Sequence, residues 1–219
     1  NNLIVRFKYY FHRHSNHLIK HDDKFKNDFN EIVTTLNSIS DADLIENFIE
    51  RKVERPNIKS LSEPINSLLK EKLQALNWEA ESGIFKEPPY DSGNRSRWRL
   101  DFAKNKISVE VAFNHQEATA HNIMKPVLAS ELNHVQKDIQ TELGVIIVAT
   151  EEMKRKGNFD SAIGTFEKFI EYFKPYNNLI TVPIVLIGLE KPQTFQIDSK
   201  SKKSAGFFNI IIFNFFFLY

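Results

Sequence analysis

Apolar residues in the first third of the chain recur at the spacing of an amphipathic helix. Two consecutive segments, 27–39 and 41–49, carry this pattern. Its positions are Phe29, Ile32, Val33, Leu36, Leu44, Ile45 and Phe48. A further helix is expected up to about residue 77, with Ser60 or Ser62 as its cap and Pro64 tolerated in the first turn. We therefore expect a helical N-terminal region whose last helix ends near Trp78 and Glu81.

The pattern changes to strict alternation after the loop 86–95, which contains proline and glycine. The runs WRLDFA (98–103) and ISVEVAF (107–113) flank a short KNK turn and are rich in residues that favour strands. They predict a β-hairpin. Asp101 lies on one arm and Glu110 on the other, so these two carboxylates can converge.

The rest of the chain alternates between helical spacing and apolar runs. Helices are expected at 117–139, where Pro126 marks a kink or restart, and at 159–173. Buried strands are expected at 144–150 and 181–189. This order predicts an α/β fold with a central mixed β-sheet flanked by helices.

The C-terminal stretch 205–219 (AGFFNIIIFNFFFLY) differs abruptly from what precedes it. It is shorter than the about 20 residues that a membrane-spanning helix needs. It is either a terminal pair of buried strands or a disrupted end of the reading frame, and the abrupt change favours the second. We assign residues 1–190 to one domain and 191–219 to a truncated or aberrant tail. The chain begins at Asn1 rather than Met, which leaves its natural N-terminus open.

Composition narrows the function only slightly. The 219 residues are 42% hydrophobic, which agrees with one globular domain. The 29 basic and 28 acidic side chains nearly cancel, so any surface that binds a polyanion must be local. The absence of cysteine excludes disulfides, thiolate metal sites and a cysteine nucleophile, and a cytoplasmic location is expected.

The hairpin carboxylates form a minimal ligand set for a hard divalent cation. Mg²⁺ prefers oxygen ligands and keeps several of its waters, so the protein needs to supply only a few ligands. Asp101, Glu110 and the carbonyl of Val111 are enough for this. Such an ion can neutralise a phosphate, activate water and stabilise a leaving alkoxide. The spacing D-x8-E is weak by itself, and two exposed hairpin carboxylates are its more frequent interpretation.

The surrounding sequence favours the metal site. WRLDFAKNKISVEVAF resembles the active-site hairpin of PD-(D/E)xK nucleases, and more narrowly that of type II restriction endonucleases of the BglII and BamHI kind. Further similar segments lie before and after the hairpin, in the same order, along about residues 65–189. They are INSLLKEKLQALNW, SELNHV, VIIVAT and VPIVLIGL. The resemblance implies the PD-(D/E)xK nuclease fold for the catalytic domain 1–190. No single short motif is diagnostic; the evidence is that several similar segments occur together in the same order.

The same resemblance implies roles for individual residues. Asp101 and Glu110 would be catalytic Mg²⁺ ligands together with the Val111 carbonyl, and Glu81 would be a second metal ligand or a water positioner. An exposed glutamate at a helix end is the alternative for Glu81. The third motif position, usually Lys, and Gln or Glu in BglII-like enzymes, is Ala112. Either the ion and the substrate phosphate activate the water with help from Glu81 or Glu131, or the enzyme is impaired.

Recognition of DNA is expected on the segment that follows the second hairpin arm. Asn114, His115 and Gln116 can hydrogen-bond to base edges in the major groove, and Asn114 can also cap a helix. A local basic patch beside the carboxylates should contact phosphates. Its members are Arg95, Arg97, Arg99, Lys104 and Lys106, of which the two lysines are alternatively plain surface residues.

Four histidines near the N-terminus match no trusted zinc spacing, and a solvated helix or loop is the preferred interpretation. They are His12, His14, His17 and His21.

The resemblance implies a homodimer that cleaves double-stranded DNA at a short palindrome, with a GATC core, as a type II site-specific deoxyribonuclease paired with a DNA methyltransferase. The helix expected over 125–139 is the candidate dimer interface, and core packing is its alternative. The competing hypotheses are a repair or transposition nuclease, a catalytically impaired DNA-binding protein on the same fold, and a structural domain whose carboxylates point apart.

Overall fold

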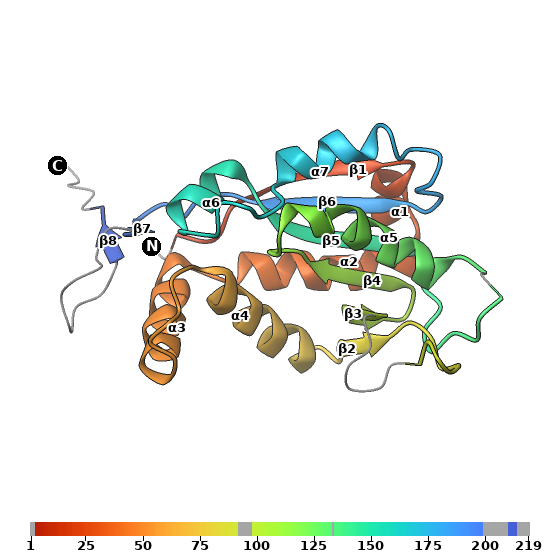
Figure 1. The fold of residues 1–219 in the computed structure, drawn as a ribbon, viewed down its shortest axis with the longest axis horizontal. Coiled ribbons are helices and arrows are strands. Elements are labelled where there is room, and N and C mark those ends of the chain that lie inside the picture. Colours follow the sequence, from red (N-terminus) through yellow and green to blue (C-terminus); the bar gives the residue numbers. More distant parts are fainter. Residues whose placement is uncertain (1–2, 92–97, 133, 199–209, 214–219) are drawn as a thin grey trace.

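A six-stranded mixed sheet forms the centre of the computed structural model, which describes residues 3–91, 98–132, 134–198 and 210–213 (Figure 1). The strand order is β1-β6-β5-β4-β3-β2. Pairing is parallel for β4–β5 and β5–β6 and antiparallel for the other neighbours. The strands are β1 (Phe7–His12), β2 (Glu79–Gly83), β3 (Arg99–Lys104), β4 (Ile107–Val111), β5 (Leu143–Ala149) and β6 (Ile184–Leu189). The expected central mixed sheet with flanking helices is confirmed.

Helices cover both faces of this sheet. They are α1 (Ser15–His21), α2 (Asp23–Asn37), α3 (Asp41–Glu54), α4 (Ser62–Ala75), α5 (Thr119–Ser130), α6 (Glu151–Lys156) and α7 (Phe166–Phe173), with a 3-10 turn η1 (Gln116–Ala118) before α5. β7 (Phe195–Ile197) and β8 (Ile210–Ile212) form a second, two-stranded sheet that is not hydrogen-bonded to the large one.

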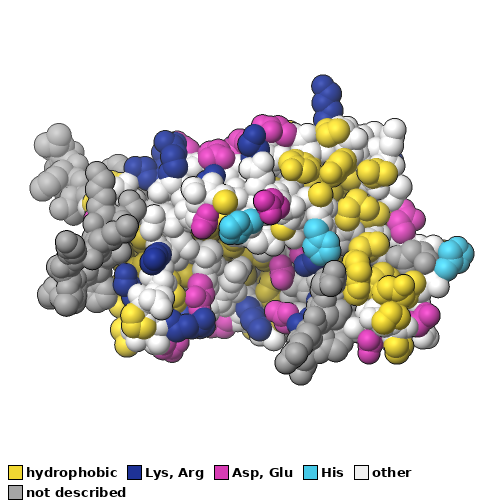
Figure 2. Space-filling model, in the orientation of Figure 1, with side chains coloured by type: hydrophobic (Ala, Val, Ile, Leu, Met, Phe, Trp, Pro, Cys, Tyr) yellow, Lys and Arg dark blue, Asp and Glu magenta, His cyan; other side chains and the backbone are white. Residues whose placement is uncertain are grey.

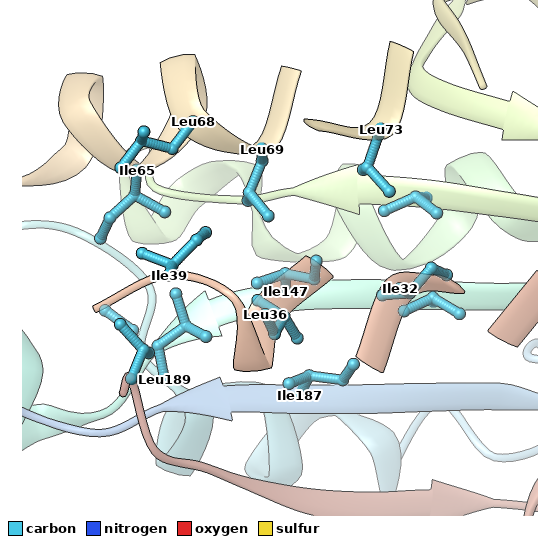
Figure 3. Packing of buried hydrophobic residues seen from close by; sticks show 14 of the residues in the cluster. Ile32, Leu36, Ile39, Ile65, Leu68, Leu69, Leu73, Ile147, Ile187 and Leu189 are labelled. Atoms are coloured by element: carbon cyan, nitrogen blue, oxygen red, sulfur yellow. The ribbon is translucent and has the colours of Figure 1, made fainter. Parts of the chain in front are cut away.

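The larger core lies between the sheet and the N-terminal helices. In Figure 3, leucines of α4 point toward α2, and α2 in turn lies over the strands β5 and β6. Leu36 of α2 and Leu69 of α4 are fully buried, as is Ile147 on the facing side of β5. Burying each such side chain contributes about 1.5 to 3 kcal/mol, so the helical layer is fixed on this face of the sheet.

The second core lies on the opposite face, under α5 and α7. Ile146 of β5 and Leu186 of β6 pack there against Ile123 of α5 and Phe169 of α7. Helix α5 comes unusually close to the sheet, because a Cβ added at Gly144 of β5 would lie 2.6 Å from the Cβ of Pro126. A glycine at this position lets the helix seat against β5.

The structure confirms the hairpin, the buried strands β5 and β6 and the helices α2 and α3, and it corrects several other expectations. The first third is not wholly helical, because β1 pairs with the distant strand β6. The chain after Trp78 forms the edge strand β2 rather than a helix end. Helix α4 begins after Leu61, which gives no side-chain cap, so neither expected serine caps it.

Two predicted helices are shorter than expected. The helix expected over 117–139 ends at Ser130, since Glu131 is extended and the following chain turns back so that Lys137 bridges to Phe85. Its predicted dimer-interface portion is therefore mostly irregular. In the region predicted as 159–173, helix α7 starts at Phe166, and the separate helix α6 precedes it.

The described part of the C-terminal stretch pairs as a strand with β7. Phe195 and Ile197 of β7 are buried in the main core, whereas Ile211 and Ile212 of β8 are exposed, so the described residues do not form the buried strand pair that was the less favoured alternative for this stretch. Within the described residues, no helix is both long and apolar enough to cross a membrane.

Candidate metal and DNA-cleavage site

Three acidic residues occupy one row across the strands β2, β3 and β4. The pairs Ala80–Phe102 and Ser82–Leu100 place Glu81 opposite Asp101. The β3–β4 register, which begins with Phe102–Val109, continues to Asp101 opposite Glu110. Residues opposite one another in neighbouring strands point to the same face. Asp101 and Glu110 therefore point to the same face of the sheet, and the exposed Glu81 lies opposite Asp101 on the edge strand β2.

Asp101 is half-buried and held by the end of the neighbouring strand. Its Oδ2 accepts a hydrogen bond of 2.6 Å from the backbone N–H of Val111. Burial raises the pKa of Asp101 above its ordinary value, although the Val111 amide and the charge of Lys125 act in the opposite direction; the Glu81 charge adds to the rise. The carboxylate is thus fixed in position next to a second acid.

Glu110 is a buried carboxylate with an open oxygen. Its side chain is 2% exposed, and Oε2 accepts a hydrogen bond of 2.7 Å from Lys125 Nζ. Within the described residues no hydrogen bond reaches Oε1. Burial, followed by the charge of Asp101, raises the pKa of Glu110 well above its ordinary value; Lys125 and the Asp101 backbone amide oppose the rise. An unpartnered buried carboxylate oxygen costs free energy, so the site is suited to a cation that would bind it.

Sequence reasoning missed Lys125, which comes from α5 on the face that covers Glu110. It is the one Lys, Arg, Asp or Glu in the helix sequence TAHNIMKPVLAS, and this isolated charge was the available signal. Acidic, basic and histidine side chains gather near the middle of the face that displays β4 and α5 (Figure 2).

Glu81 lies on a strand, so the alternative of a helix-end glutamate is wrong. Its backbone has a φ of 57°, in the left-handed region, and this interrupts the ladder beside Asp101. The side chain is exposed and lies 3.7 Å from the Arg99 guanidinium. Its negative charge reaches Asp101. Glu81 can therefore approach an ion or water bound beside Asp101 from the solvent side.

The third motif position and Glu131, the other candidate for helping to activate water, differ in position. Ala112 is buried among the apolar residues under α5 and α7, so it offers no polar group. Glu131 accepts a hydrogen bond from the Thr181 hydroxyl near the start of β6, and its charge acts on Lys137. It is absent from the groups that shift the pKa of Asp101 or Glu110. Among these candidates, Glu81 is the one beside the carboxylates.

The expected basic patch is only partly beside the site. Arg99 is there, through its contact with Glu81. Arg95 and Arg97 lie outside the described residues. Lys104, at the far end of the hairpin, forms an ion pair of 2.7 Å with Glu31 and is 18% exposed. Lys106 pairs with Glu142. The two lysines serve the packing of the hairpin turn rather than the carboxylate site.

The segment after β4 that was expected to contact DNA bases is exposed at Asn114, His115 and Gln116. Asn114 does not cap the following 3-10 turn, whose N-cap is His115 without a side-chain bond. Instead, its Oδ1 accepts a hydrogen bond of 2.7 Å from Asn122 of α5. The segment is thus tied to the helix that also carries Lys125.

The N-terminal histidines do not form a metal site in the structure. His12 is buried, and its Nε2 lies 3.0 Å from the carbonyl oxygen of Ile180. His17 and His21 stack on one face of α1. Among the described residues, no group of three or more His, Cys, Asp or Glu side chains could hold a metal ion. A site made from two carboxylates and a backbone carbonyl remains available at Asp101, Glu110 and Val111.

Comparison with known proteins identifies the family and the fold of the chain. A sequence model of the family described as "Restriction endonuclease BglII/BglIII" matches residues 7–189. No curated protein matches the chain. Two similar solved structures are restriction endonuclease BglII complexed with a DNA 16-mer and free BglII. The first has a TM-score of 0.61 and 13% identity, covering 95% of this chain and 100% of that chain. The second has a TM-score of 0.49 and 15% identity, covering 95% and 91%.

The likeness to the DNA-bound structure extends over nearly the whole of both chains, and it confirms the PD-(D/E)xK fold that the hairpin sequence implied. The family match includes every strand of the large sheet and all the acidic residues of the row. The sequence resemblance and the fold thus lead to the same group of enzymes, and the chain belongs to the family of BglII/BglIII restriction endonucleases.

Proposed function

We propose that the protein is a Mg²⁺-dependent type II restriction endonuclease that hydrolyses phosphodiester bonds of double-stranded DNA at a short palindrome with a GATC core. The observation that carries this proposal is the buried Glu110, whose Oε1 is left open beside the second carboxylate Asp101. Carboxylate oxygens are the ligands that Mg²⁺ prefers. Membership of a restriction endonuclease family supports the same reading.

Asp101, Glu110 and the Val111 carbonyl would hold the ion, and Glu81 would approach it from solvent. The bound ion supplies charge neutralisation, water activation and stabilisation of the leaving oxygen. The protein's own share is positional. The Val111 amide fixes Asp101, burial excludes bulk water from Glu110, and the exposed Glu81 can hold a water by hydrogen bonding.

DNA would lie across the exposed side of this site. Arg99 and Arg97 would contact phosphates, which position the duplex without specifying its sequence. Asn114, His115 and Gln116 would reach base edges in the major groove. The similar BglII structure with a DNA 16-mer supports this choice of ligand.

We further propose that two copies act together, since each subunit of a twofold dimer can read one half-site and cut one strand. Apolar side chains gather on the side of the molecule where the chain leaves α5 and α7 (Figure 2). Leu132 is 82% exposed there and Leu179 is 58% exposed. A DNA methyltransferase of the same specificity would protect the host DNA. Sedimentation of the purified protein tests the dimer, and a monomer at all concentrations would exclude it.

Digestion of plasmid DNA with Mg²⁺ tests the activity. Discrete fragments are expected from the unsubstituted protein, whereas Asp101→Ala and Glu110→Ala should bind DNA and leave it uncut. Full cleavage by either variant would exclude the assigned site. A smear of fragments would instead indicate a nuclease without site specificity, such as a repair or transposition enzyme.

A catalytically impaired DNA-binding protein is the second candidate, favoured by Ala112 at the third motif position. It predicts metal-independent DNA binding and no cleavage with Mg²⁺ or Mn²⁺ at any concentration. Cleavage by the unsubstituted protein would exclude it.

A further inference from the structure

Among the residues that the structure describes, Lys125 and Glu110 form the most deeply buried ion pair. Nζ and Oε2 are 2.7 Å apart, and the two side chains are 15% and 2% exposed. Lysine and glutamate are rarely buried to this extent, and replacing a buried ion pair with apolar residues is often neutral or stabilising. The rest of α5 packs through apolar residues such as Ile123 and Val127. A lysine at this position therefore calls for a role other than stability.

The helix holds the lysine in a fixed place. Pro126, the next residue, lies so close to β5 that only a glycine fits opposite it, at Gly144. Asn122, one turn earlier, is buried and bonded to Asn114. Lys125 thus sits between two fixed contacts, directly above β4.

The contact makes the two carboxylate oxygens of Glu110 different. Lys125 occupies Oε2, whereas Oε1 has no hydrogen bond among the described residues. The carboxylate cannot rotate freely without breaking the bond to Nζ. Oε2 is therefore held by Lys125, while Oε1 stays free of protein donors among the described residues.

Lys125 also stands where the strand lacks a polar group. Side chains of β4 alternate, so Glu110 and Ala112 point to the same face, which α5 covers. Ala112 provides neither a charge nor a hydrogen bond. Lys125 brings a polar, charged group to this face from the helix, and its charge acts on both Asp101 and Glu110.

We propose that Lys125 is a positioning residue of the cleavage site, which holds Glu110 through Oε2 so that Oε1 is presented as the metal ligand, in place of the polar side chain absent at Ala112. The proposal rests on the proposed function, because it assumes that Asp101 and Glu110 bind a divalent ion. A residue of helix α5 would thus take the part that the third position of the PD-(D/E)xK motif, on the strand, normally plays.

Binding of Mn²⁺ to the metal-free protein, followed by calorimetry, tests this role apart from cleavage. Loss of a residue that orients a metal ligand typically costs about 10- to 100-fold in metal affinity or activity. We expect Lys125→Met to weaken Mn²⁺ binding and slow single-turnover DNA cleavage by such factors while leaving DNA binding in EDTA unchanged. Lys125→Arg, which keeps the charge and the donor, should recover most of both.

Lys106→Met is the matched control, because it removes a lysine of the hairpin turn that does not contact the carboxylates. Thermal unfolding in EDTA should show that Lys125→Met is folded; if it is not, Lys125→Gln takes its place. Unchanged or tighter Mn²⁺ binding by the folded variant would overturn the proposal. If Asp101→Ala abolishes Mn²⁺ binding while Lys125→Met does not alter it, only this inference fails. If the unsubstituted protein binds no Mn²⁺, the proposed metal site fails as well.

Discussion

Replacing Glu110 with glutamine should stabilise the metal-free protein while it removes the proposed metal ligand. Glu110 is 2% exposed. Its pKa lies well above the ordinary value because burial and the Asp101 charge disfavour the carboxylate more than Lys125 favours it. Glutamine has nearly the same shape and no charge, and its amide oxygen can accept the hydrogen bond from Lys125. The change removes a desolvated charge without opening a cavity.

The size of the gain follows from linkage. Each unit by which folding raises a carboxyl pKa costs about 1.4 kcal/mol of stability once the pH exceeds both the folded and the unfolded values. Single stabilising replacements commonly contribute about 0.5 to 2 kcal/mol. For a chain of this length, that range corresponds to a rise in Tm of about 1 to 8 °C.

The stability difference between Glu110→Gln and the unsubstituted protein should depend on pH in a defined direction. Below the ordinary value of 4.5, Glu110 is protonated in both the folded and the unfolded protein. As the pH rises through the raised folded pKa, the unsubstituted protein loses stability relative to Glu110→Gln. Thermal unfolding in EDTA should therefore show a gap at about pH 8 that closes toward acid pH. Glu71→Gln, an exposed carboxylate of α4, is the control. A variant no more stable than the unsubstituted protein at neutral pH, or a gap that widens on acidification, refutes the reasoning.

Three further predictions concern the surroundings of the site. Gly144→Ala places a Cβ 2.6 Å from Pro126; such overpacking costs about 1 to 3 kcal/mol, so Tm and cleavage rate should both fall, and unchanged values would disprove the close packing of α5. Lys104→Met leaves Glu31 without its ion pair and should lower the free energy of unfolding by about 1 to 3 kcal/mol. Lys106→Met removes only the exposed ion pair with Glu142 and should lower it by less than about 1 kcal/mol; equal effects of the two substitutions in urea titrations would contradict this difference. Because the pKa values of Asp101 and Glu110 are raised, Mn²⁺ affinity should fall on acidification starting above pH 4.5, and an affinity independent of pH down to that value would show that neither carboxylate binds the ion.

The hairpin was predictable because its information is local. Both arms and the KNK turn are contiguous, and the alternation of apolar residues determines which side chains share a face. The same register that buries Val109 puts Asp101 opposite Glu110. The proposed ligand pair could therefore be identified from sequence before the rest of the site.

Features that depend on distant partners were not predictable in this way. Strand β2 reads EAESG and has no apolar alternation; it lies at the edge of the sheet, where Glu79 and Glu81 are exposed. Lys125 meets Glu110 only through the docking of α5 on β4. Val135 and Ile139 have helical spacing, yet they pack onto the cluster around Phe85 after the helix has ended. The spacing of apolar residues alone cannot distinguish a helix from an irregular segment that packs against the same core.

The location of a bound ion tests the central claim most directly. Crystals soaked in Mn²⁺ should show one anomalous peak shared by Asp101 and Glu110, at about 2.1 to 2.3 Å from Oε1 of Glu110 and from the Val111 carbonyl oxygen. The peak should disappear in Glu110→Ala. A peak at other residues, or one that persists in Glu110→Ala, would contradict the assignment of this carboxylate row as the metal site.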